Sequence, residues 1–389
     1  MTTMKIFRNS ILAAAALVFG LTSCNSDGPH IDNEEKVFII QVSGAPQNRA
    51  EQSSGQGVTA TLSSGVAFLI APDGSVVASH GLSIGGNPGD IDGPAGQGQV
   101  LGSYPSNTRV FIVGNVADVY DAATYTALTG ATTWNAIQQI TQTTASYANA
   151  TAELPILSNH SGQPASMSMV TSTEASVTVS ISPVTARLEL GTITGGVWTD
   201  PSTATNQTEI LGFTIAGVYV DNYFEEFNYA GVGQGDVFSQ GVSTTFAGIG
   251  DPGSWIAAGT PGAMVAAPAL ATPTNWWAYN VPAGTISRIM IAVTNVTYQA
   301  TTDGGTNWVP GGSISPTNTY YLTISDYRTG PGVAGIWNDN FVRGFVYGVN
   351  NITFNTVNLH NTPNPTEVPL TVNITVRPWD YQGLNADLQ

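Results

Sequence analysis

Residues 368–379 read VPLTVNITVRPW and form the most regular alternating stretch of the chain. Apolar side chains occupy every second position of this stretch: Val368, Leu370, Val372, Ile374 and Val376, followed by Trp379. A period of two is typical of a β-strand with one buried face. We expect this strand to pair with a sheet edge, because an unpaired strand of this kind is a template for aggregation.

Shorter segments rich in β-branched and aromatic residues recur upstream and predict a mainly β protein. We predict strands at 36–44, 66–70, 76–78, 109–116, 176–190, 209–220, 287–298 and 319–325. One short helix is predicted from the helical spacing of apolar residues and a preceding capping threonine. Its residues are Trp134, Ile137, Ile140 and Tyr147, after Thr132 or Thr133. The simplest architecture is two β-sandwich domains, at 50–175 and 176–389.

The composition excludes several functions. Only 9% of the 389 residues are charged, against about 25% in an average soluble protein. The net charge of −16 disfavours binding to nucleic acid, whose phosphates would repel the chain. From Ala50 onward there is no lysine, which excludes lysine chemistry there, and the single cysteine excludes an intrachain disulfide.

The first 23 residues have the features of an export signal. Lys5 and Arg8 precede an apolar run of ten residues at 11–20, which is too short for a permanent membrane span. The sequence LTSC at 21–24 follows, and small residues before a cysteine resemble a bacterial lipobox. Cys24 is then the lipidated first residue of the mature protein, and an ordinary secretory signal is the alternative.

A polar tether and one strand follow Cys24. Residues 24–35 are polar and acidic, and Val37, Phe38, Ile39, Ile40 and Val42 lie in the predicted strand at 36–44. The next segment, 46–57, has the composition of an exposed linker and contains Arg49 before Ala50. An isolated basic residue in such a linker is a ready site for a trypsin-like protease.

No arrangement of residues predicts an enzyme, a metal site or a cofactor. The sequence GLSIG at 81–85 matches the nucleophile-elbow pattern, but the Gly- and Pro-rich residues after it cannot form the required helix. Asp90 and Asp92 fit a calcium loop only partly, and a solvated loop is the simpler interpretation. Trp276 and Trp277 suit either core packing or a sugar- or partner-binding platform.

Several phrases, taken in order, resemble the fimbrillins of the Bacteroidetes type V pilus. They are the lipobox at Cys24, the strand VFIIQVSG at 37–44, Arg49-Ala50, VTARL at 184–188, NTYYL at 318–322 and LTVNITVRPW at 370–379. The resemblance spans nearly the whole chain, although each phrase is short. It implies two transthyretin-like β-sandwich domains and a surface-exposed precursor anchored by lipid in the outer membrane.

The resemblance also implies a mechanism of assembly. A surface protease cuts after Arg49, the first strand leaves, and the C-terminal strand of another fimbrial subunit, here 368–389, fills the vacated groove. Residues 24–49 are then a propeptide, and the protein supports adhesion as part of a fimbrium. A carbohydrate-binding lipoprotein and a lipid-retaining pilus anchor are the alternatives, with host or bacterial glycans or proteins as further partners.

Overall fold

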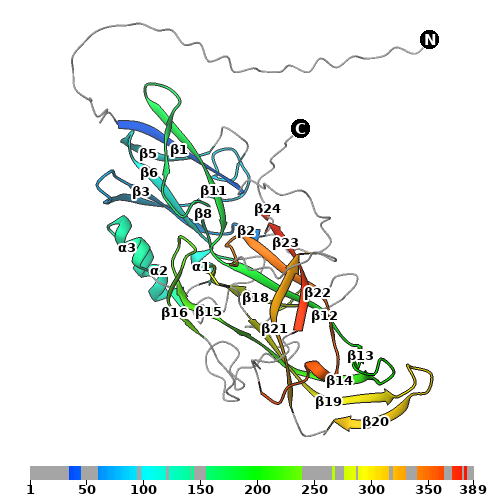
Figure 1. Cartoon of the computed structure of the whole chain (residues 1–389). Helices are drawn as coiled ribbons and strands as arrows, with labels where there is room; N and C mark the ends of the chain where they lie inside the picture. Colours follow the sequence, from blue (N-terminus) through cyan, green and yellow to red (C-terminus); the bar gives the residue numbers. More distant parts are fainter. Residues whose placement is uncertain are drawn as a thin grey trace, which may run out of the picture. The chain divides into compact units, whose positions relative to one another are not determined.

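The computed structural model describes residues 35–44, 60–93, 98–119, 122–140, 142–143, 155–238, 265–267, 276–285, 288–314, 319–329, 340–362, 370–378 and 381–382. All of them belong to one compact unit, Asn33–Gln389. Strands dominate this part of the chain, as the sequence predicts, and they form two large sheets and two small ones (Figure 1).

The first large sheet follows the order β4-β3-β6-β8-β11-β1-β5, with β9 paired to β6 and β10 paired to β11. Its strands are β1 (Glu35–Gly44), β3 (Gly65–Ile70), β4 (Val76–Gly81), β5 (Gln99–Pro105), β6 (Arg109–Gly114), β8 (Leu157–Asn159), β9 (Ala165–Ser166), β10 (Ser168–Met169) and β11 (Glu174–Pro183). Most neighbours are antiparallel, but β1 runs parallel to β11.

This sheet curls until its two end strands, β4 and β5, meet along a seam closed by side chains. The Gln99 side chain accepts a hydrogen bond from the Ser83 N–H at 2.8 Å and donates one to the Gly81 carbonyl at 2.9 Å. His80 Nε2 lies 2.8 Å from the Tyr104 hydroxyl. Within the described part, β5 is therefore held by a backbone ladder to β1 and by side chains to the β4 end.

The second large sheet follows the order β13-β14-β19-β21-β23-β22-β12-β18-β17, with β20 paired to β19. Its strands are β12 (Ala186–Gly195), β13 (Val197–Thr199), β14 (Gln207–Asp221), β17 (Val265–Ala267), β18 (Trp276–Val281), β19 (Arg288–Thr301), β20 (Val309–Ile314), β21 (Tyr320–Thr329), β22 (Phe345–Phe354) and β23 (Leu370–Pro378). Its core is aliphatic and aromatic, and includes Leu188, Ile291, Tyr327 and Phe354.

Smaller elements complete the described part. One small sheet joins β7 (Gln142–Thr143), β15 (Tyr223–Phe227) and β16 (Gly233–Phe238), and another pairs β2 (Ala60–Thr61) with β24 (Tyr381–Gln382). The helices are α1 (Val116–Val119), α2 (Ala122–Thr129), α3 (Trp134–Gln139) and the 3-10 turn η1 (Thr356–Asn358).

The helix prediction was partly wrong. The predicted helix exists as α3, and the Thr133 side chain accepts the Ala136 N–H as its N-cap, but Ile140 already has extended geometry at the C-cap. Tyr147 lies outside the described residues. The expectation of one helix is also corrected, because α1 and α2 are helical; the AATYTALT sequence of α2 contains three threonines, which are weak helix formers.

The predicted strands are confirmed as β1, the β3–β4 hairpin, β6, β14, β19, β21 and β23. The change from the first large sheet to the second falls between Pro183, the end of β11, and Ala186, the start of β12. The segment predicted as one strand at 176–190 thus contributes to both sheets. The division into domains at 175/176 stays a prediction.

Arg343 connects these two sheets. Its side chain is enclosed, with 8% of the residue exposed. It donates hydrogen bonds to Ser158 Oγ at 2.9 Å and the Ser182 carbonyl at 3.0 Å on the first sheet, and to the Ala230 carbonyl at 2.8 Å. The planar guanidinium suits this role because its five N–H groups fan out toward several acceptors at once.

We predict that Arg343→Met lowers the free energy of unfolding by about 2–4 kcal/mol, because several buried acceptors lose their donor. The measurement is urea denaturation followed by intrinsic fluorescence. Arg109→Met, at a half-buried arginine, is the matched control and is expected to cost less. Equal losses for the two variants would contradict the connecting role of Arg343.

Candidate functional site: the slot occupied by β1

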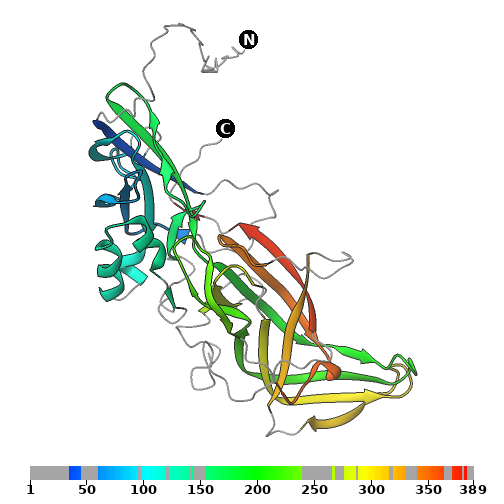
Figure 2. The same ribbon diagram turned by 60° about the vertical axis from the view of Figure 1, so that its left-hand side comes forward.

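The strand β1 lies inside the first sheet, between β11 and β5. Its parallel ladder with β11 runs from the Val37–Glu174 pair to the Gly44–Ile181 pair. Its antiparallel ladder with β5 runs from the Glu35–Pro105 pair to the Ile40–Gln99 pair, with an irregularity after Phe38. Figures 1 and 2 both show β1 beside β11. We call the space that β1 fills between β11 and β5 the β1 slot.

Side chains of β1 alternate between the core and the outer face, as the sequence predicts. Phe38 and Ile40 are 0% exposed and Val42 is 1% exposed, whereas Val37 is 39% exposed. The three buried side chains pack in one core cluster with the buried residues of β11. Phe38 also meets the Tyr104 ring of β5 edge-on, with ring centroids 5.7 Å apart. The β1 slot is thus a row of three apolar positions.

Polar contacts fix β1 along its length. The Lys36 ammonium donates to the Ser172 carbonyl at 2.5 Å, at the turn that enters β11. The Gln41 side chain donates to the Gly93 carbonyl at 3.0 Å, and the Val42 N–H donates to the Ile91 carbonyl at 3.0 Å. These contacts help to fix the register of β1. A shift by one residue would break them, and it would also turn Phe38 and Ile40 outward.

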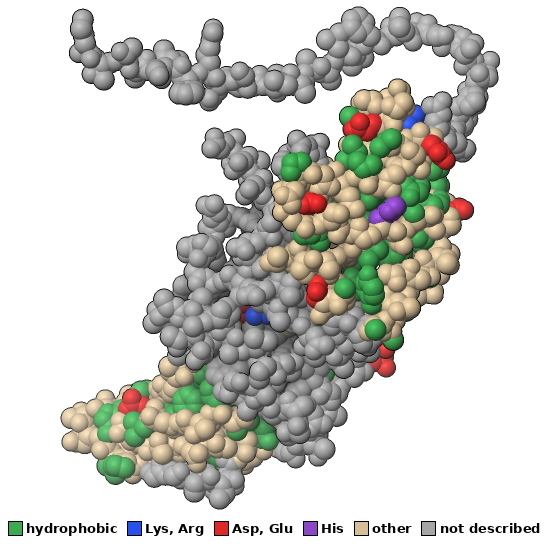
Figure 3. All heavy atoms as spheres, turned by 180° about the vertical axis from the view of Figure 1, so that it is seen from behind, with side chains coloured by type: hydrophobic (Ala, Val, Ile, Leu, Met, Phe, Trp, Pro, Cys, Tyr) green, Lys and Arg blue, Asp and Glu red, His purple; other side chains and the backbone are tan. Residues whose placement is uncertain are grey.

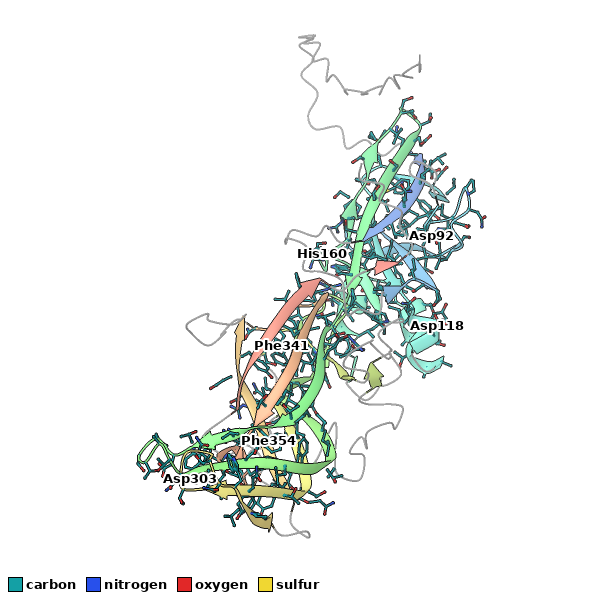
Figure 4. All side chains as sticks on the ribbon, turned by 90° about the vertical axis from the view of Figure 1, so that its right-hand side faces the viewer. Asp92, Asp118, His160, Asp303, Phe341 and Phe354 are labelled. Carbon is teal, nitrogen blue, oxygen red and sulfur yellow. The ribbon has the colours of Figure 1, made fainter. Side chains whose placement is uncertain are left out.

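Two histidines near this sheet resist protonation. Partial burial lowers the pKa of His80, whose ring meets Tyr104 at the seam. Burial also lowers the pKa of His160, with a further contribution from the positive charge of Arg343. The His160 Nδ1 lies 3.2 Å from the Ser182 hydroxyl, and Figure 4 labels His160 on the first sheet.

The remaining predicted site residues divide into two groups. Cys24, Arg49, Ala50, Val368 and Trp379 lie outside the described residues. Leu370, Val372, Ile374 and Val376 lie in β23, and Trp276 and Trp277 lie in β18, but only the backbone of these residues is described. The β1 slot therefore contains one predicted set, the removable strand at 37–42.

The strand β23 is paired on both sides within its own sheet. It runs parallel to β21, from the Ile324–Leu370 pair to the Thr329–Ile374 pair. It runs antiparallel to β22, from the Phe345–Pro378 pair to the Gly348–Thr375 pair. The sequence predicted that this strand pairs with a sheet edge, and in the structure it has a partner strand on each side.

The described residues contain no cluster of three side chains suited to a metal ion. The Asp92 carboxylate accepts the Gly85 and Gly86 N–H groups, and the Asp90 carboxylate accepts the Asn87 N–H. Hydrogen bonds within the loop thus occupy these carboxylates. No helix among the described residues is long and apolar enough to cross a membrane.

Comparison with solved structures identifies the fold. A candidate cell adhesion protein from Bacteroides eggerthii matches with a TM-score of 0.53 and 16% identity, over 90% of this chain and 98% of that one. A candidate cell adhesion protein from Parabacteroides distasonis matches with a TM-score of 0.52 and 11% identity, over 90% and 100%. The tip fimbrial protein Mfa3 from Porphyromonas gingivalis gives 0.41 and 14%, over 89% and 100%.

The chain shares its fold with these two candidate cell adhesion proteins of Bacteroidetes. This agrees with the resemblance inferred from the sequence. No family model matches the sequence, and no curated protein matches it either.

Sequence reasoning missed the residues that hold β5 in place. Gln99 and Tyr104 close the seam, yet each is an isolated polar residue in a strand and carries no local signal. Asn115 was missed as well. Asn115 is 0% exposed and has a φ of 63°. Its side-chain amide donates hydrogen bonds to the Thr61 and Pro155 carbonyls. The Gly-Asn pair at 114–115 is the one signal that indicates a turn there.

We predict that Phe38→Ala lowers the free energy of unfolding of the uncleaved chain by about 3–5 kcal/mol, because it leaves a cavity in the core. Val37→Ala, at the neighbouring position on the outer face, is the matched control and should cost less than about 1 kcal/mol. Urea denaturation of both variants measures the difference. Similar losses would show that β1 is not buried as described.

We also predict that stability falls as the pH decreases from about 6.5 toward 5. The folded chain keeps His80 and His160 neutral because their pKa values are lowered. The unfolded chain therefore binds protons first, so the stabilisation is complete above the unfolded pKa and is lost as the pH falls through the folded values. The double variant His80→Gln/His160→Gln should flatten this part of the curve; an unchanged slope would contradict the assignment.

Proposed function

We propose that this protein is a structural subunit of a fimbrium, with no enzymatic activity and no cofactor. In the proposed pathway it is exported as a lipoprotein anchored in the outer membrane through Cys24, and a surface protease cuts it between Arg49 and Ala50. The strand β1 then leaves, and the C-terminal strand of another fimbrial subunit, residues 368–389, enters the β1 slot. The two-domain transthyretin-like arrangement belongs to this proposal.

The observation that carries the proposal is the position of β1. It is an interior strand with two ladders, yet it belongs to the segment that a cut after Arg49 would separate from the rest of the chain. Removal of β1 would leave β11 and β5 with unpaired edges and would expose three apolar positions. Such a slot favours an added strand, which supplies main-chain hydrogen bonds and alternate side-chain anchors.

The strand β23 has the properties that the β1 slot requires. It has nine residues, against ten in β1. It already forms one parallel ladder and one antiparallel ladder, which is the combination that β1 forms with β11 and β5. Its apolar residues alternate in the sequence, at the spacing with which Phe38, Ile40 and Val42 fill the slot.

The energetics of this exchange also favour a durable polymer. Burial of three apolar side chains in the slot contributes about 1.5–3 kcal/mol each, before the cost of ordering the strand is subtracted. In the described chain β23 is paired within its own sheet, so donation requires its release from β21 and β22. Because each subunit gives a strand to one neighbour and takes one from another, the contact does not close on itself and yields filaments.

The test examines both the cut after Arg49 and the donation of the C-terminal strand. With the native sequence we expect surface protein whose N-terminus is Ala50, and a ladder of bands on an unboiled denaturing gel that collapses on boiling. Arg49→Ala should leave lipidated full-length monomer, because β1 stays in its slot. Deletion of residues 368–389 should stop polymer growth at the truncated subunit.

Arg49→Lys is the matched control. A protease specific for arginine cuts after Arg49 but not after a lysine at this position, whereas a broader trypsin-like protease cuts after both. Normal filaments from both Arg49→Ala and the deletion would refute the proposal. A lipidated Cys24 with a single monomer band from the native sequence would instead favour a pilus anchor or a carbohydrate-binding lipoprotein, and binding to glycans through Trp276 and Trp277 would then be measured.

A further inference from the structure

The basic residues of the chain have an unusual distribution. From Ala50 onward the sequence contains no lysine and six arginines in 340 positions, namely Arg109, Arg187, Arg288, Arg328, Arg343 and Arg377. All six lie among the described residues. Five of them lie within strands, and Arg343 is a buried residue in a turn.

This placement matters for proteases that recognise Lys or Arg. Such an enzyme binds several residues around the cleaved bond as a separate extended segment, so the substrate backbone must first leave its neighbours. Exposed, flexible loops meet this requirement, and strands inside a sheet meet it only after local unfolding. The rate of cutting then falls with the population of the opened form.

Two arginines of the first half are enclosed by their own sheets. Arg109 begins β6 and is paired with Ile70 on one side and Ser166 on the other. Arg187 is 2% exposed, and Leu188, which follows the bond to be cut, is 1% exposed. Neither backbone can enter a protease without breaking a ladder.

Two arginines of the second sheet are also in ladders. Arg288 is paired with Asp221, and the next two residues, Ile289 and Met290, are both 0% exposed. Arg328 lies near the end of β21 and is paired with Asn373 in the ladder with β23.

The last two arginines are protected in different ways. The guanidinium of Arg343 is used inside the protein, where it donates to the Ser158 hydroxyl and the Ser182 carbonyl. Arg377 is paired with Val346 in the ladder between β22 and β23. Pro378 follows it, and proteases of this class cut poorly before proline, whose ring fixes φ and removes the N–H.

Four exposed turns differ from these strands in containing no basic residue. The turns at 71–75, 85–90, 200–206 and 302–307 contain Gly, Asp, Asn, Ser and Thr but no Lys or Arg. Figure 4 labels Asp303 at the turn between β19 and β20. On the face drawn in Figure 3, the described surface is mainly uncharged and scarcely any of it is basic.

We infer that this protein, in the part of the chain from Ala50 onward, is built to resist proteases that cut after Lys or Arg. The inference goes beyond the proposed function, because it needs neither a cut at Arg49 nor polymerisation. It also accounts for the low charge of the chain: hydroxyl and amide side chains keep the turns polar without offering a basic residue for cleavage. The implied partner is a trypsin-like protease acting where the protein is displayed.

The test is digestion of the purified full chain with trypsin, followed by intact mass measurement. Under native conditions every product is expected to retain residues 50–389 uncut. The same bonds should be cut at least about a thousandfold faster in chain unfolded by urea, because unfolding removes the need for local opening. Cutting after Arg109, Arg187, Arg288, Arg328 or Arg343 in the folded chain would overturn the inference.

A matched pair of variants shows whether placement alone gives the protection. Thr203 is exposed in the turn at 200–206. Thr203→Arg should create one new cut after position 203, and Thr203→Gln, a polar side chain without charge, should remain intact. An uncut Thr203→Arg protein would also overturn the inference. Filament failure with an intact body would refute the proposed function alone.

Discussion

The structure of the first sheet depends on the burial of one face of β1. Phe38, Ile40 and Val42 fill the space between β11 and β5, and the two ladders of β1 are the backbone link between those strands. Buried apolar residues of this kind are ordinary core residues of a sheet in a globular protein. What distinguishes them is that a single cut in the following segment separates them from the rest of the chain.

Such a cut need not dissolve the sheet, because the seam between β4 and β5 is made by side chains that do not belong to β1. Gln99 bonds to the backbone at Gly81 and Ser83, and Tyr104 meets His80. These contacts give β5 a second attachment when its ladder to β1 is absent. An incoming strand would then find two edges, one parallel and one antiparallel, and β23 has that combination in its own sheet.

Charge has an unusual role in this molecule. Two of the few cationic groups, Lys36 and Arg343, are used for internal hydrogen bonding, Lys36 at Ser172 and Arg343 at Ser158 and Ser182. The turns are closed by carboxylates and hydroxyls instead: the Asp303 carboxylate accepts the Thr301 hydroxyl and the Asn307 and Thr306 N–H groups, which lowers its pKa. A polar surface is thus achieved with almost no basic side chains.

The sequence by itself determined the secondary structure of the regular strands, because a period of two is a local property: the alternation at 37–42 and 370–376 predicted β1 and β23. It also indicated the class of fold through composition and ordered phrases. Only the tertiary structure decided which strands are neighbours. Nothing local in the sequence could place β1 between β11 and β5, enclose β23 between β21 and β22, or bring Gln99 to Gly81, since these contacts depend on how distant segments fold together. Arg343 is the clearest case, because its partners lie more than 100 residues away and one arginine in a turn has no pattern of its own.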